Sequence, residues 1–340
     1  MVKGFRQIAS LTMLSRVFGM VRDMSLAYFF GAGVLMDSWA IAFKIPNLAR
    51  RIFGEGAAAS SLIPVYSKEL ERDKKSAVEV GCTVVTVICV LLACIVLAGE
   101  AFIWFFYEFI SDYSSTDLVL KLSAVMLPYM IMICVVAILA GILNSHRHFA
   151  APAAAPVVLN IFIISTLWIS GKWLDIGADK QLFIVAGSVL VAGIGQLLLQ
   201  MGPLRAAGVR LRPCWKVKSE AFRKIILLMG PMILGLTATQ LNTLSDDLIA
   251  KYFSGSAEKG EYLSLLGHMV RYPLWDGAVS QLYYSQRLYQ LPLGVLGISL
   301  ATAIFPVMSA EAARKNYGKL LRTISIGIRG TIFIAFPATA

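Results

Sequence analysis

Long apolar runs separated by short polar segments make up most of the chain, and nine of them are long enough to predict membrane-spanning helices. A hydrocarbon core of about 30 Å needs roughly 20 residues of α-helix, and each run has about that length or more. The second run is interrupted by Pro46 and by Gly54-Glu55-Gly56, which predicts a broken helix. The predicted spans are 5–31, 34–66, 78–106, 118–143, 152–171, 181–201, 223–252, 282–308 and 319–340.

The composition agrees with a membrane protein and excludes several soluble classes. Hydrophobic residues make up 58% of the 340 positions, charged residues only 15%, and the mean hydropathy is +0.72. An ordinary soluble enzyme, a disordered chain and a secreted disulfide scaffold are therefore excluded. The five cysteines form no C-x-x-C pair and the three histidines lack ligand spacing. We expect no metal centre and no cofactor.

The basic residues predict the orientation in the membrane. With the amino terminus in the cytoplasm, that side carries eighteen lysines and arginines in its loops and the opposite side carries six. The positive-inside rule then predicts a multi-pass protein with a cytoplasmic amino terminus. Basic loops facing anionic headgroups explain most of the net charge of +11, so we expect no nucleic-acid partner.

Several cations fall inside the predicted spans, where they are costly. An arginine or lysine at the bilayer centre costs about 2.5–3.5 kcal/mol, so the five in the first two spans would cost about 15 kcal/mol if they faced lipid. The acids in the same spans are three, too few to neutralise them. The cations are Arg16, Arg22, Lys44, Arg50, Arg51, Arg287 and Arg329, and the acids are Asp23, Asp37 and Glu55.

Three charges of the second span recur every seven residues, which places Asp37, Lys44 and Arg51 on one stripe of an ideal helix. A break at Pro46 would alter the phase and could turn Arg50 inward instead of Arg51. One interpretation is that these charges form interhelical salt bridges or reach the headgroups. The other is a water-filled cavity with cationic walls. Guanidinium groups bind phosphate in a bidentate manner, so such a cavity would take a phosphate or pyrophosphate headgroup.

A weak internal repeat favours a transporter built of two halves. Leu62-Ile63-Pro64-Val65-Tyr66-Ser67 at the end of span two is similar to Ile304-Phe305-Pro306-Val307-Met308-Ser309 at the end of span eight. Six spans separate the copies, so both have the same orientation. This predicts two six-helix lobes related by an axis along the membrane normal.

At these residues the chain resembles the MurJ (MviN) family of lipid II flippases, in the superfamily that also holds multidrug and polysaccharide exporters. The first 60 residues carry the most specific matches, and further matches run through the whole chain. The matching segments are Ser15-Arg16-Val17-Phe18-Gly19-Met20-Val21-Arg22-Asp23, Phe30-Gly31-Ala32-Gly33, Ala42-Phe43-Lys44-Ile45-Pro46-Asn47-Leu48-Ala49-Arg50-Arg51, Glu55-Gly56-Ala57, Gly141-Ile142-Leu143-Asn144, Ala151-Pro152-Ala153, Leu159-Asn160, Tyr283-Tyr284, Arg287-Leu288 and Leu291-Pro292.

The resemblance implies an all-α polytopic membrane protein with two six-helix lobes related by a pseudo-two-fold axis along the membrane normal, around a cationic cavity. We expect an amino-terminal lobe at 1–201, a basic cytoplasmic loop at 202–222 and an incomplete, truncated second lobe at 223–340. The family moves lipid II, the undecaprenyl-pyrophosphate-linked peptidoglycan precursor, across the bacterial plasma membrane for cell-wall biogenesis. The family's substrate-binding positions fall here on Arg16, Arg22, Asp37, Arg50 and Arg287, to which Lys44, Arg51 and Glu55 are added.

The expected protein is thus a transporter and not an enzyme. It would work by alternating access as a monomer among membrane lipids, with lipid II as its substrate and with a counter-ion as a further candidate partner. Three departures from the family pattern stand out. Gln286 replaces the usual acid before Arg287, His148 stands beside Arg147 where an arginine is expected, and the loop 253–281 is longer than usual.

Two alternatives stay open. The first is a related exporter of other polyprenyl-linked glycans, which binding assays against several undecaprenyl-pyrophosphate lipids would distinguish. The second is an intramembrane enzyme on polyprenyl phosphates, in which Asp246 and Asp247 hold a divalent metal. Neighbouring residues of a helix diverge by about 100°, which disfavours a shared metal. The same pair is also a candidate site for a counter-ion such as sodium.

Overall fold

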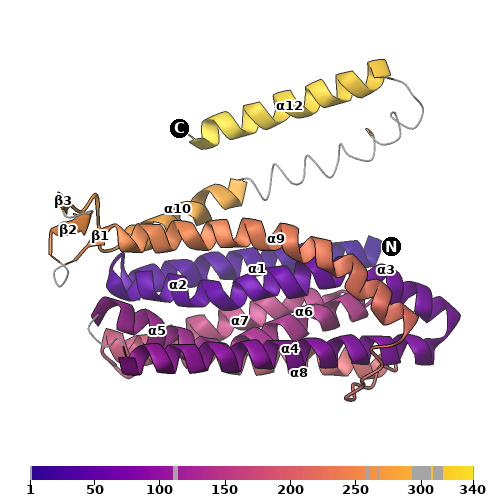
Figure 1. Cartoon of the computed structure of the whole chain (residues 1–340). Coiled ribbons are helices and arrows are strands. Elements are labelled where there is room, and N and C mark those ends of the chain that lie inside the picture. Colours follow the sequence, from indigo (N-terminus) through magenta and orange to yellow (C-terminus); the bar gives the residue numbers. More distant parts are fainter. Residues whose placement is uncertain are drawn as a thin grey trace. The chain divides into compact units, whose positions relative to one another are not determined.

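The computed structural model describes residues 2–109, 114–256, 260–265, 268–292, 308 and 317–339. These residues are mainly α-helical, and they form two compact units, 1–279 and 280–340. Most of the helices belong to the first unit (Figure 1). They are α1 (Val2–Phe30), α2 (Val34–Ala49), α3 (Ala57–Arg72), α4 (Lys74–Phe109), α5 (Ser114–Met126), α6 (Tyr129–Ser145), α7 (Ala150–Trp168), α8 (Ala178–Ala206) and α9 (Glu220–Tyr252), with π-helical turns η1 (Arg50–Gly56) and η2 (Ile169–Trp173).

The helices of the first unit pack side by side around an apolar core. α1 lies along α7, α7 lies along α8, and α2 packs against α5. α9 packs against α3, η1 and α2, so the first unit extends across the predicted 202–222 loop to residue 279. The lobe boundary at that loop stays a prediction. The largest fully buried side chains include Leu26, Met36, Trp39, Tyr66, Leu122 and Tyr129.

The predicted second span is interrupted at the Gly54-Glu55-Gly56 patch, as expected, but not at Pro46. Pro46 lies inside α2, and the helical hydrogen bonding changes to a π-helical turn in η1, between Arg50 and Gly56. Glycine is required in this turn because a Cβ on Gly54 would lie 2.7 Å from the Cβ of Ala137 on α6. The π-turn therefore brings the chain into close contact with α6 before α3 begins.

The predicted fourth span, 118–143, is not one straight helix. Its first part, Asp117–Met126 of α5, meets α6 at a bend of 43°. Pro128 lies at the bend as the amino-terminal cap of α6. Proline lacks the backbone N–H and its ring clashes with the carbonyl four residues earlier, so it kinks or breaks a helix. The apolar run alone did not reveal this bend.

The described helices agree with a membrane protein. Four of them, α4, α7 with η2, α8 and α9, are long and apolar enough to cross a membrane, and the bent α5–α6 pair would be a fifth. α9 exposes leucines at seven-residue intervals, which puts an apolar stripe on the surface of the first unit. An outward-facing apolar stripe of this kind is typical of helices in lipid or against further helices. The stripe consists of Leu227, Leu234, Leu241 and Leu248.

The long loop after α9 contains the few strands of the structure. β1 (Ser254–Gly255) pairs in parallel with β4 (Leu274–Trp275), and β2 (Tyr262–Leu265) pairs with β3 (His268–Arg271) in an antiparallel hairpin. The sequence indicated an unusually long loop here but did not predict its strands. Its two ends return to the same place, beside the end of α9.

The second unit contains α10 (Ala278–Pro292), apart from its first two residues, and α12 (Tyr317–Thr339). α12 corresponds to the predicted ninth span. The predicted eighth span, 282–308, is described up to residue 292 and at residue 308. The repeat copy at 304–309 lies outside the described residues except for Met308, so the internal repeat stays a prediction.

Candidate functional site

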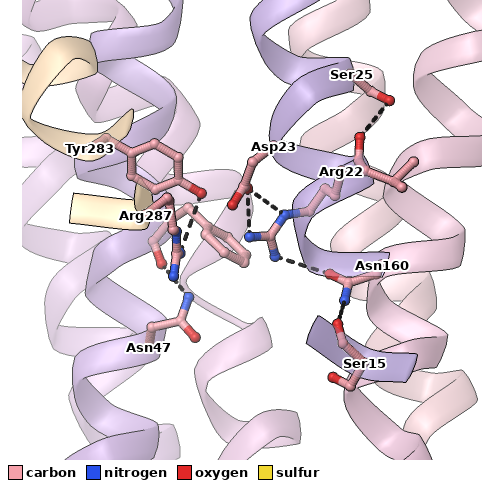
Figure 2. Close-up of polar contacts among 10 residues, drawn as sticks. Ser15, Arg22, Asp23, Ser25, Asn47, Asn160, Tyr283 and Arg287 are labelled. Atoms are coloured by element: carbon pink, nitrogen blue, oxygen red, sulfur yellow. Dashed lines mark hydrogen bonds and ion pairs between the residues drawn. The ribbon is translucent and has the colours of Figure 1, made fainter. Parts of the chain in front are cut away.

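Arg22 is the arginine of the predicted site that the structure buries most clearly. Arg22 is only 8% exposed, and its guanidinium points from α1 toward α7 (Figure 2). The Nη2 and Nε groups both donate to Oδ1 of Asp23, at 2.7 and 3.0 Å. The Nη1 group donates to Oδ1 of Asn160 at 3.1 Å, and the guanidinium carbon lies 5.8 Å from the ring centre of Phe43 on α2. Three helices therefore fix the position of this cation.

Asn160 on α7 orients the guanidinium. Its oxygen accepts from Arg22, while its Nδ2 donates to the backbone carbonyl of Ser15 at 3.3 Å. The two bonds define which end of the amide faces the arginine, because only the oxygen can accept. The sequence analysis matched Asn160 to the family pattern but assigned it no role. An amide in an otherwise apolar run was the available signal.

Arg16 and Arg50, the other two predicted arginines of this unit, have different surroundings. Arg16 is exposed on the surface of α1. Arg50 is partly buried at the start of η1, where its Nε donates to Oδ1 of Asn47 at 3.4 Å. Asn47 in turn donates to the carbonyl of Phe43 at 2.8 Å. Phe43 therefore contacts Arg22 through its ring and the Asn47 partner of Arg50 through its carbonyl.

The predicted stripe of the second span exists, and it faces α9. Lys44 forms an ion pair with Asp247 and donates to the carbonyl of Thr243 at 3.0 Å. Arg51 donates through Nη1 to Oε1 of Gln240 at 3.2 Å. The order of partners shows that α9 runs antiparallel to α2. For Lys44, the structure therefore places the charge in an interhelical salt bridge, which is the first of the two interpretations of the stripe.

Asp37, the third member of the stripe, is fully buried at the beginning of α2. Its Oδ2 accepts from the backbone N–H of Gly277 at 3.0 Å and lies 3.9 Å from Nζ of Lys251. Lys251 also lies 3.7 Å from Oδ1 of Asp276. The contacts of Asp37 thus come from the last turn of α9 and from the end of the long loop, neither of which the sequence had connected with it.

Asp246 and Asp247 diverge, as the helix geometry predicts. Asp247 is buried against Lys44, whereas Asp246 is exposed. Among the described residues, no group of three or more histidine, cysteine, aspartate or glutamate side chains could hold a metal ion. The role of Asp246 and Asp247 as a cation site stays a prediction.

Arg287 belongs to the second unit and contacts Tyr283, the first tyrosine of the predicted motif (Figure 2). Its Nη2 donates to the hydroxyl of Tyr283 at 3.4 Å, and its guanidinium carbon lies 4.9 Å from the centre of that ring. Such cation–π contact holds a guanidinium flat on an aromatic face. Of the remaining predicted site residues, the side chain of Glu55 lies outside the described part of the chain.

Comparison with known families gives a consistent result. The profile of the family "Lipid II flippase MurJ" matches residues 26–340. A "Probable lipid II flippase MurJ" of Vibrio cholerae is 31% identical over 97% of this chain and 61% of its own length. The protein of the same name in Rhizobium meliloti is 32% identical over 100% of this chain and 61% of its own length. The chain thus spans about 61% of the length of these relatives.

Solved structures show the same fold. A lipid II flippase MurJ in an inward closed conformation has a TM-score of 0.70 at 23% identity, covering 97% of this chain and 63% of its own. An inward-facing multidrug resistance transporter of the MATE family has a TM-score of 0.65 at 15% identity, covering 97% of this chain and 71% of its own. These likenesses show that the chain shares the helical fold of these transporters over the part that it covers.

Proposed function

Because the chain belongs to the lipid II flippase MurJ family, we propose that it binds a lipid-linked pyrophosphate and takes part in moving lipid II across the bacterial plasma membrane. The membership confirms the resemblance carried by the motifs around Arg16, Arg22 and Lys44. It also identifies a multi-pass protein of the inner membrane. The proposed activity is transport by alternating access, without a covalent step on the substrate.

The geometry of Arg22 carries the proposal. A guanidinium buried between helices needs polar partners, and here it has one carboxylate and one amide oxygen. Its planar donors match the oxygens of a phosphate in the same bidentate manner as they match a carboxylate. Asp23 therefore occupies the position that a pyrophosphate oxygen would take.

An exchange of partners follows from this arrangement. When the headgroup enters, its oxygens replace the carboxylate of Asp23, while Asn160 keeps the guanidinium in place. When the headgroup leaves, Asp23 returns to Arg22. The internal carboxylate thereby limits the affinity for the headgroup, which a transporter needs for release on the other side. We assign this role to Asp23 because it is the acid that pairs with Arg22, whereas Asp37 accepts from Gly277.

Arg16, Arg50 and Arg287 are proposed as further contacts of the headgroup. Arg16 is exposed and Arg50 partly buried, so both can change partners at lower cost than Arg22. Arg287 is proposed from its position in the family motif, and its guanidinium lies over the ring of Tyr283 on its own helix. Removal of any one of the three should weaken binding less than removal of Arg22.

The test is lipid binding by the purified chain in nanodiscs. Wild-type protein is expected to bind undecaprenyl pyrophosphate, and Arg22→Ala is expected to lose about 30-fold in affinity, because charge-assisted hydrogen bonds contribute about 1.5–3 kcal/mol. Arg22→Lys keeps the charge but not the planar donors, so it should recover only part of the loss. Arg223→Ala, an exposed arginine at the start of α9, is the matched control. Equal affinity of wild type and Arg22→Ala would refute the assignment.

The same assay separates lipid II transport from the export of other polyprenyl-linked glycans. Pyrophosphate is common to both substrate classes, so contacts at Arg22 do not distinguish them. Tighter binding of lipid II than of undecaprenyl pyrophosphate carrying an unrelated glycan supports the proposed substrate. Equal binding of the two favours the broader exporter.

A further inference from the structure

The two ends of the long loop after α9 are hydrogen-bonded to each other and to α9. β1 and β4 pair where the loop leaves and returns, and the N–H of Leu274 donates to the carbonyl of Phe253 at 3.3 Å. The hydroxyl of Ser254 donates to the carbonyl of Ala250 on the last turn of α9 at 2.6 Å. The base of the loop is thus tied to α9, while its β2–β3 hairpin extends away from it with β3 fully exposed.

Directly after β4, the chain forms a corner at Asp276 and Gly277 that contacts α2. The N–H of Gly277 donates to Oδ2 of Asp37. A Cβ on Gly277 would lie 2.7 Å from the carbonyl oxygen of Ala32, and its φ of +95° also favours glycine. The corner therefore lies against the α1–α2 turn, where only glycine can approach so closely.

Lys251 lies between the two carboxylates that meet at this corner. Its Nζ is 3.9 Å from Asp37 on α2 and 3.7 Å from Asp276 in the loop, and within the described residues it makes no direct hydrogen bond although it is buried. Ion pairs at these distances lack the short, aligned hydrogen bonds that make a pair strong. The contacts hold the charges together but can separate at modest cost.

We propose that the corner at Asp276–Gly277 is a clasp that keeps the Gly33 end of α2 against the end of α9. It joins α2 through the N–H of Gly277 and α9 through Asp276 and Lys251. Separation of α2 from α9 at this end requires the corner to release Asp37. Asp276 and Gly277 are positioning residues, since they act through Asp37 and Lys251.

This inference rests on the proposed function for its biological meaning, because alternating access requires helices to part at one end of the molecule. If the amino terminus is cytoplasmic, as the basic loops predict, the clasp lies at the outer end. Release of the corner would then accompany opening toward the outside. Release of the corner would then be a step found only in family members that carry this long loop.

The test measures access to the seam between α2 and α9 without any lipid substrate. Ala250 is buried on α9, one heptad after Thr243, and Ala250→Cys places a thiol there. The native cysteines other than Cys134 are replaced. Cys134 is fully buried on α6 and reports general unfolding. Labelling with a water-soluble maleimide is followed at both thiols in nanodiscs.

In this background, Asp276→Asn should raise the labelling rate at position 250 about fivefold, as expected for loss of one weak ion pair, and leave Cys134 unlabelled. Lys251→Met should raise it at least as much, because two carboxylates then face each other. Glu261→Gln is the matched control: it removes a carboxylate of the same loop that pairs at 4.0 Å with the exposed Arg271. It should change the rate by less than about twofold.

Two results would overturn the clasp: an unchanged rate at position 250 in Asp276→Asn, or a rate that rises equally at Cys134. An increase in Glu261→Gln equal to that in Asp276→Asn would also count against it. Because the labelling is done without the lipid substrate, a negative labelling result leaves the pyrophosphate binding of Arg22 untouched. Failure of lipid binding, in turn, would overturn the proposed function and leave the clasp standing.

Discussion

The Lys44–Asp247 ion pair between α2 and α9 allows a quantitative test of the seam. The side chains are 18% and 5% exposed, so both charges are largely removed from solvent. Lys44→Met would leave Asp247 as a buried carboxylate without its cation. Breaking a buried pair in this way costs about 3–5 kcal/mol, and the residual exposure of Lys44 favours the lower end, about 3 kcal/mol.

Replacing the acid of the pair should lower the free energy of unfolding by less than replacing the lysine. After Asp247→Leu, Lys44 still donates to the carbonyl of Thr243, so we expect a loss of about 1.5 kcal/mol. The double variant replaces both charges by apolar side chains of similar volume and should lie within about 1 kcal/mol of wild type. The cycle then gives a coupling energy of roughly 4 kcal/mol.

Equilibrium unfolding in mixed micelles, followed by tryptophan fluorescence, measures these free energies. The control is the ion pair of Glu79 with Lys216, whose side chain is 58% exposed; Lys216→Met should leave the unfolding free energy nearly unchanged because Glu79 still lies 3.6 Å from Arg212. Additive effects of the Lys44 and Asp247 substitutions would refute the ion pair between α2 and α9, because independent residues show no coupling energy.

Three further predictions test separate parts of the structure. Gly54→Ala should destabilise the protein by about 1–3 kcal/mol because its methyl group would lie 2.7 Å from a side chain of α6, whereas Gly187→Ala on α8, with no neighbour within 4 Å, should be neutral or stabilising; thermal unfolding checks both. Burial, and secondly the charge of a nearby lysine, lowers the pKa of His146 below its ordinary value of 6.5. The folded state therefore binds fewer protons than the unfolded state, and the free energy of unfolding should fall as the pH drops below about 6.5. His146→Phe should remove this dependence in unfolding measured from pH 5 to 8. Asn160→Leu should weaken binding of undecaprenyl pyrophosphate about tenfold by releasing the guanidinium of Arg22, with little change in a binding control that uses undecaprenol, and unchanged pyrophosphate binding would contradict the orienting role.

Local patterns predicted much of the fold because membrane helices are specified by length and apolarity. The nine apolar runs coincide with helices over most of the described residues, apart from the turn at 127–128, and four or five of these helices are long and apolar enough to cross a membrane. The seven-residue spacing of Asp37, Lys44 and Arg51 correctly placed them on one face. The bend at Pro128 was missed because the run is apolar on both sides of the proline. A hydropathy pattern records burial in lipid, whereas a change of helix direction depends on one backbone group.

The partners of the site residues could not be predicted in the same way. Lys44 and Asp247 lie far apart in sequence, and only the packing of α2 on α9 brings them together. Asn160 gave little signal because an amide among apolar residues has many structural roles. The contacts of Asp37 depend on Gly277 at the end of a loop whose strands show no clear alternating pattern. Pairing across a fold is set by tertiary packing, which spacing within one helix does not encode.

The central claim is that the guanidinium of Arg22 receives the pyrophosphate in place of Asp23. The most direct measurement is solid-state NMR of the chain in nanodiscs, with ¹⁵N-labelled arginine and bound undecaprenyl pyrophosphate, observing ¹⁵N–³¹P dipolar coupling. We predict a coupling from guanidinium nitrogen to headgroup phosphorus that is largely kept in Arg16→Lys and in Arg50→Lys but falls most strongly in Arg22→Lys. Bound lipid whose ¹⁵N–³¹P coupling is the same with and without the Arg22 guanidinium would contradict it.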